Sequence, residues 1–114
     1  KLEDILIHDI SSASPAQLLQ LVQNKPYIHT VHLSISINHI EKLVIRLAER
    51  CPNLQRLTIY TRNEFSTLSN ASLLALSKHC QQLQELDFHQ CVLLTEAAVL
   101  QFIQSCKYLS KLKL

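Results

Sequence analysis

The sequence predicts an α/β solenoid with a parallel sheet on its concave face and helices on its convex face. The first observation is a spacing of apolar residues, L-x-x-L-x-L with conservative replacements, that starts at Leu2, Ile28, Leu54, Leu83 and Leu109. The intervals are 26, 26, 29 and 26 residues, and a near-constant period of this size indicates stacked repeats. The second observation is that apolar positions in each unit first alternate, as in a strand, and then take helical spacing. Strands separated by helices run parallel.

In the first two units, each helix start is marked by a polar residue followed three residues later by Gln or Glu. Ser14 stands before Pro15 with Gln17 in that relation, and Asn38 is related to Glu41 in the same way. Side chains of this kind bind the exposed amides of a helix N-terminus. The second helix is then expected to carry its apolar stripe on Ile40, Leu43, Val44 and Leu47.

The helices of the third and fourth units are defined by their similarity to each other. Residues 68–80 match residues 94–106 in length and in their apolar positions. Ser69 and Thr95 are therefore expected to cap the two helices. Residues 109–114 are expected to form a terminal strand with an open edge, which further repeats or a cap would cover in an intact protein. We therefore expect residues 1–114 to be a single domain of about four repeats plus a terminal strand, and a fragment of a longer protein.

The unit of 29 residues carries three extra residues between Tyr60 and Leu68. Insertions in repeat proteins fall in loops on one face, where binding residues concentrate. One interpretation is a contact loop with Arg62 and Phe65 as its main contact residues. The other is a tolerated surface insertion with Phe65 turned inward.

Three of the four cysteines recur with the repeat. Cys51, Cys80 and Cys106 each lie three residues before a repeat start, so we expect them to occupy the same place in successive units. Thiols in such a position are best interpreted as small buried apolar groups in a reducing compartment. A zinc site is the weaker alternative, because the chain has no C-x-x-C pair.

Composition excludes several classes of protein. The 11 basic and 9 acidic residues give a net charge of +2, which is too balanced to indicate nucleic acid or a membrane surface as the partner. The chain contains no glycine, which removes the Gly-dependent phosphate loops of most nucleotide-binding enzymes. It shows no signal peptide and no apolar run long enough to span a bilayer. We expect a cytoplasmic or nuclear protein without a cofactor.

The closest match to a known family lies between Cys80 and Cys106. The positions that match are Leu83, Leu86, Phe88, Cys91, Leu94, Thr95, Ala98 and the closing Cys106. They resemble the cysteine-containing leucine-rich repeat of F-box proteins. Earlier units depart from the pattern, because Lys25 precedes Pro26 where a cysteine is expected and Arg62 replaces the cysteine after the third strand.

The resemblance implies a protein-protein interaction module. In that family the repeats form the substrate-recognition arm of an SCF-type E3 ubiquitin ligase, and a separate F-box binds the adaptor. This chain shows no F-box, so the adaptor would be reached only through an F-box outside it. The alternative is a leucine-rich repeat scaffold with no F-box or ligase role.

Side chains between the inward-facing leucines of each strand are expected to point outward in columns that cross the strands. The first column holds Asp4, Thr30, Arg56, Glu85 and Lys111, the second holds Leu6, His32, Thr58, Asp87 and Lys113, and the third holds His8, Ser34, Tyr60 and His89. A protein partner is expected to bind here, with Arg56, Tyr60 and His89 as the strongest candidates. The further candidates are Glu85, Asp87, Lys111, His32, Arg62 and Phe65. The alternative is a solvated face whose ion pairs contribute about 0–1 kcal/mol each.

The six histidines do not indicate a metal or catalytic site. His8 and His89 should lie three strands apart, about 14 Å, which is too far to share an ion. The recurring cysteines are expected to be buried, so no Cys-His pair can be argued. We therefore expect no enzymatic activity and no metal.

Overall fold

The computed structural model describes residues 4–10, 20, 27–35, 40–61, 68–88, 91 and 93–114. The strands are β1 (Asp4–Ile10), β2 (Thr30–Ile35), β3 (Arg56–Thr61), β4 (Glu85–Phe88) and β5 (Lys111–Lys113). The helices are α2 (Ile40–Arg50), α3 (Asn70–His79) and α4 (Glu96–Ser105). From β2 to β5, strands and helices alternate. The helix start expected at Ser14 and the cap expected at Asn38 lie outside the described residues.

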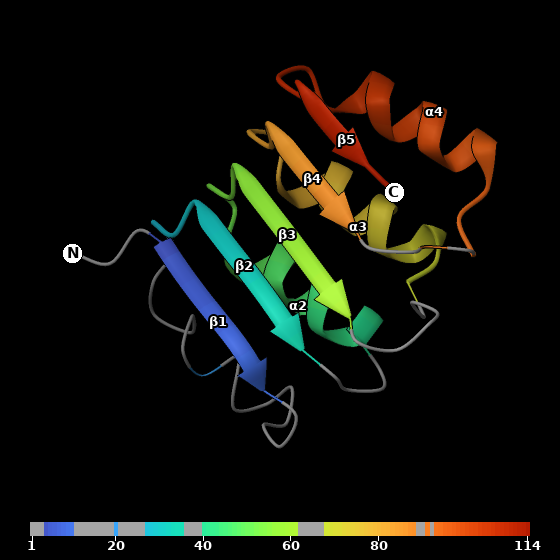
Figure 1. The fold of residues 1–114 in the computed structure, drawn as a ribbon. Helices are drawn as coiled ribbons and strands as arrows, with labels where there is room; N and C mark the ends of the chain where they lie inside the picture. Colours follow the sequence, from blue (N-terminus) through green and yellow to red (C-terminus); the bar gives the residue numbers. More distant parts are fainter. Residues whose placement is uncertain are drawn as a thin grey trace.

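The five strands form one sheet in the order β1-β2-β3-β4-β5, and every neighbouring pair is parallel. The three described helices lie behind this sheet, α3 beside α2 and α4 beside α3, and none of the described helices covers its other face (Figure 1). The predicted α/β class with a parallel sheet is confirmed. From β2 onward, each strand pairs with the next strand along the chain because a helix returns the polypeptide to the same end of the sheet.

The core lies between the sheet and the helices. Along β2, β3 and β4, buried apolar residues alternate with half-buried or exposed polar ones, as expected for a sheet covered on one face. The strands contribute Val31, Leu33, Leu57, Ile59, Leu86 and Phe88 to the core. The helices contribute Ile40, Leu43, Val44, Leu47, Ala48, Leu73, Leu76 and Phe102.

Each helix leads into the next strand through a turn centred on a buried cysteine. The Cys51 amide donates to Leu47 O at 2.9 Å, and Cys51 O accepts from the Leu54 amide at 3.1 Å. The turns at Cys80 and Cys106 repeat the same two hydrogen bonds, so the predicted equivalence and burial of the three cysteines are confirmed. Burial raises the pKa of Cys51 to about 11 and that of Cys80 to about 12, which keeps these thiols protonated at neutral pH.

The Cys80 thiol lies against the end of the preceding helix. Its sulfur is 3.6 Å from Ala48 O and 3.4 Å from Cys51 O, two carbonyls at the C-terminus of α2. The last carbonyls of a helix have no partner within the helix. The thiol of one unit therefore serves as a weak donor to the preceding unit.

The entry into each strand is also repeated. The carbonyl of the residue just before one strand accepts two successive amides at the start of the next, at 2.7 and 2.9 Å where His29 O meets Gln55 and Arg56. Gln55 O and Gln84 O accept pairs of amides from the following strands in the same way. This contact sets the register at the first residue of β3, β4 and β5.

Candidate functional site

The outward columns predicted from the sequence agree with the register of the sheet. Asp4, Thr30, Arg56, Glu85 and Lys111 lie opposite one another on successive strands, as do Leu6, His32, Thr58, Asp87 and Lys113. In the third column His8, Ser34 and Tyr60 are in register. His89 lies outside the described residues, as do Arg62 and Phe65. We call the outward residues of β2 to β5 the open face.

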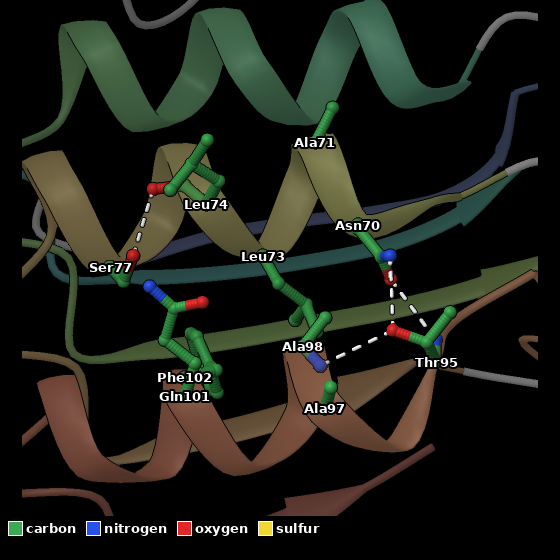
Figure 2. A pocket seen from close by; sticks show the side chains of 10 residues that line it. All are labelled: Asn70, Ala71, Leu73, Leu74, Ser77, Thr95, Ala97, Ala98, Gln101 and Phe102. Carbon is green, nitrogen blue, oxygen red and sulfur yellow. Dashed lines mark hydrogen bonds between the residues drawn. The ribbon is translucent and has the colours of Figure 1, made fainter.

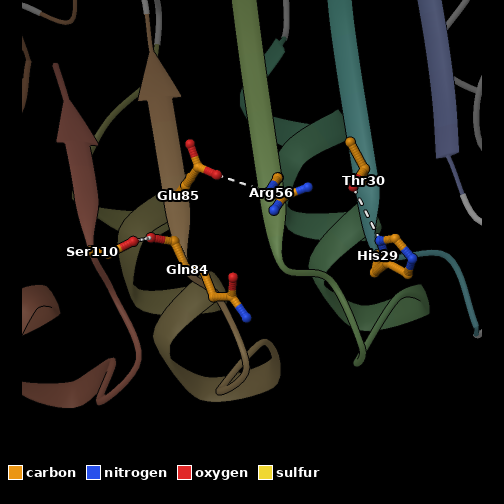
Figure 3. A network of polar contacts seen from close by, with 6 residues as sticks. All are labelled: His29, Thr30, Arg56, Gln84, Glu85 and Ser110. Atoms are coloured by element: carbon orange, nitrogen blue, oxygen red, sulfur yellow. Dashed lines mark hydrogen bonds and ion pairs between the residues drawn. The ribbon is translucent and has the colours of Figure 1, made fainter.

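The best defined contact on the open face joins β3 to β4. The Arg56 Nε donates to Glu85 Oε2 at 2.8 Å (Figure 3). The two side chains are 54% and 35% exposed, so water screens the pair and its contribution to stability is at most about 1 kcal/mol. The contact uses one of the five donors of the guanidinium.

Tyr60 lies on the same strand as Arg56, four residues further along, and is 50% exposed. Residues two apart on a strand point to the same face, so Arg56, Thr58 and Tyr60 form one outward row on β3. Tyrosine and arginine are among the side chains most enriched at the centres of protein interfaces. The described residues thus bring together two of the three strongest candidates.

The open face is asymmetric in charge. The outward positions of β4 carry the carboxylates of Glu85 and Asp87, and those of β5 carry the ammonium groups of Lys111 and Lys113. Within the described part of the chain, neither lysine forms an ion pair. Both lysines are exposed and can meet an anionic group on a partner.

The described histidines of the open face and its border do not form a metal site. His29 contacts Thr30 Oγ1 through Nδ1 at 3.1 Å, and His32 occupies its predicted column on β2. No group of three or more His, Cys, Asp or Glu side chains that could hold a metal ion occurs among the residues that the structure describes.

On the helix side, a shallow groove of about 360 Å³ lies between α3 and α4. Figure 2 shows Asn70, Leu73 and Ser77 on the side of α3 that faces α4. At one end of the groove, Asn70 Oδ1 accepts from the Thr95 amide and Asn70 Nδ2 donates to Thr95 Oγ1, both at 3.1 Å. Thr95 Oγ1 also accepts from the Ala98 amide at 3.2 Å, so its predicted role as the cap of α4 is confirmed.

The corresponding junction between α2 and α3 is made by a carboxylate. Glu41 Oε1 accepts from the Ser69 amide at 3.0 Å, from Ser69 Oγ, and from Ser72 Oγ at 3.2 Å. Burial would raise the pKa of Glu41, but the hydrogen bonds from Ser69 and Ser72 outweigh it and hold the pKa below its usual value. Ser69 and Ser72 therefore stabilise the ionised form of the Glu41 carboxylate.

The prediction that the Ser69 side chain caps α3 is wrong. Ser69 stands at the N-cap position of α3, but its side chain makes no capping hydrogen bond. Its hydroxyl donates to Glu41 on the neighbouring helix instead. The residues that sequence reasoning missed are Glu41 and Asn70 as contacts between units. Both lie ten residues before a recurring cysteine, and this shared offset could have revealed them.

No protein-family model matches the chain, and a search of curated proteins finds no significant relative. None of the described helices has the length and apolar character needed to cross a membrane.

Proposed function

We propose that the chain is a leucine-rich repeat segment that binds a protein partner on its open face. In this proposal the sheet lines the concave side of a solenoid and the helices form its convex side. The observation that carries the proposal is the row of outward side chains on β3, where Arg56 and Tyr60 stand half exposed on a rigid strand. Carboxylates on β4 and lysines on β5 lie to one side of this row.

The arrangement suits a polypeptide partner. Arginine and tyrosine provide large contact area with few degrees of freedom to lose, and they dominate binding energy at many interfaces. Arg56 also donates to Glu85, which favours an orientation of the guanidinium on this face. The charges of β4 and β5 would fix the register of the partner and select against others.

We further propose that this module is the substrate-recognition arm of an F-box protein in an SCF-type E3 ubiquitin ligase, in the cytoplasm or nucleus. The support is the cysteine-containing pattern from Cys80 to Cys106 and the equivalence of Cys51, Cys80 and Cys106 in the fold. The adaptor would bind an F-box outside this chain. Ubiquitin transfer would be performed by other subunits, and this chain would have no catalytic residue.

Affinity capture tests the binding face. Arg56→Glu combined with Tyr60→Ala should abolish capture of the partners that the wild-type protein retains. Arg46→Glu combined with Tyr108→Ala is the matched control, because Arg46 is a similarly exposed arginine on α2 and Tyr108 is 59% exposed in the turn before β5. Unchanged capture by the open-face variant, or equal loss in both variants, would refute the assignment of binding to this face.

Co-precipitation of the SCF adaptor with the full-length protein tests the ligase role separately. Recovery of the adaptor supports the recognition arm. Retention of open-face partners without any adaptor would instead favour the alternative, a leucine-rich repeat scaffold with no F-box or ligase role.

A further inference from the structure

One helix position is used in the same way at both helix junctions. Counting back ten residues from Cys51 and from Cys80 leads to Glu41 and Asn70. Each of these side chains accepts the amide of the first cap residue of the next helix, Ser69 or Thr95. The same count from the third recurring cysteine leads to Glu96, which is exposed on α4.

The positions three and seven residues further along lie on the same side of each helix, and three of the four in α2 and α3 are apolar and buried. Three and seven residues after Glu41 come Val44 and Ala48, both fully buried. After Asn70 the equivalent positions hold Leu73, which is buried, and Ser77, and both lie on the side of α3 that faces α4 (Figure 2).

On α4 the equivalent positions are Val99 and Ile103, and Ile103 is 45% exposed. Leu100, at the border of this surface, is 53% exposed. The surface that buries the preceding helices is therefore present on α4 but uncovered among the described residues.

We infer that this end of the fold docks a further strand–helix unit of the same design. The end face consists of Glu96, Val99 and Ile103 on α4 together with the outer edge of β5. The docked helix begins with a serine or threonine whose amide and hydroxyl donate to Glu96, as Ser69 does to Glu41. The docked strand pairs in parallel with β5 and carries carboxylates opposite Lys111 and Lys113, as β4 does on the other side.

The geometry commits to a unit joined to β5 itself. At both existing junctions, the helix that covers the preceding helix directly follows a strand along the chain. Helix α3 follows β3, and α4 follows β4. A second copy paired through β5 is disfavoured, because an antiparallel β5 pair would set lysines opposite lysines, and like charges directly opposite destabilise strand pairs.

The inference is tested by extending the chain after Leu114 with a second copy of residues 60–88. This segment carries a helix that begins after Ser69 and a strand with Glu85 and Asp87 at its outward positions. Leu114 takes the place of Ile59 in the repeat, so the copy continues in register. The stability of the original and the extended protein is measured in urea, and the protection of the added amides is measured by hydrogen exchange.

We expect the added amides to be protected and the urea midpoint to rise. Glu96→Ala should then raise the unfolding equilibrium constant of the extended protein about tenfold, the size expected for a hydrogen bond to a charged group, and should leave the original chain nearly unchanged. Ser69→Ala in the added copy should have a smaller effect, because the amide still donates. Glu49→Ala, an exposed glutamate on α2, should affect both lengths equally.

Three results would overturn the inference. The added amides could exchange as fast as those of an unfolded peptide. Glu96→Ala could have the same effect at both lengths. The original chain could form dimers in sedimentation experiments that Ile103→Asp dissociates, which would assign the end face to a second copy.

Discussion

The α2–α3 and α3–α4 junctions place different side chains at the same position. At the first junction a partly buried carboxylate, Glu41, receives three hydrogen bonds from Ser69 and Ser72. At the second a neutral amide, Asn70, exchanges two exposed hydrogen bonds with Thr95. The position is set by the geometry of the repeat. The strength of each junction and its response to pH depend on the residue that occupies the position.

The largest effect is expected from Glu41→Ala. The substitution leaves the fully buried Ser72 hydroxyl and the Ser69 amide without their acceptor, and unsatisfied groups of this kind cost about 2–3 kcal/mol. Urea denaturation should show this loss in the free energy of unfolding. Glu41→Gln, which keeps one acceptor oxygen, should lose about half as much; an equal loss in both variants would contradict the role of the acceptor.

A smaller effect is expected from acid. Because the pKa of Glu41 is lowered in the folded state, its ionised form stabilises the fold above the unfolded-state pKa, and this contribution is lost as the pH falls through the folded-state pKa. Between about pH 5 and about pH 3, the wild-type protein should therefore lose more stability than Glu41→Gln. Parallel curves for the two proteins would show that Glu41 does not carry the acid response.

Removal of the second junction should cost less. Asn70→Ala breaks hydrogen bonds between neutral, exposed groups, and the expected loss in the free energy of unfolding is about 1 kcal/mol. Asn70→Asp keeps the acceptor for the Thr95 amide and adds a charge at a helix N-terminus. It should create at this junction the acid sensitivity that only the first one has, and a pH series on this variant measures it.

The smallest effect is expected from Arg56→Ala. The pair with Glu85 joins neighbouring strands as Glu41 joins neighbouring helices, but it is exposed, and its loss should cost at most about 1 kcal/mol. The double-mutant cycle with Glu85→Ala measures the coupling. A coupling energy as large as the loss of stability in Glu41→Ala would show that the exposed Arg56–Glu85 pair is not weaker than the partly buried Glu41 contact.

The sheet and its columns were predictable from the sequence because the link between helix and strand has a constant length. Each recurring cysteine is followed by a leucine three residues later and by an outward strand residue two further on. That constancy alone places Arg56, Glu85 and Lys111 in one column. The α/β class follows from the same count.

The role of Ser69 was not predictable in this way. A serine before a helix is normally an acceptor for helix amides, but here the stronger acceptor is Glu41, 28 residues earlier in the chain. The partner of the Ser69 hydroxyl depends on the distance between α2 and α3, and this distance cannot be derived from the repeat period. Whether the open face binds a partner is likewise independent of the repeat, because outward residues can change without altering the core.

The turn at each recurring cysteine also determines where the chain tolerates changes in length. The turns at Cys51, Cys80 and Cys106 have the same hydrogen bonds, although the units that contain them differ by three residues in length. All of that difference falls between β3 and Leu68, at the opposite end of the sheet. Grafted peptides and loop extensions should therefore be accepted between Thr61 and Leu68, whereas one residue inserted between Cys51 and Leu54 would shift every side chain of β3 to the wrong face.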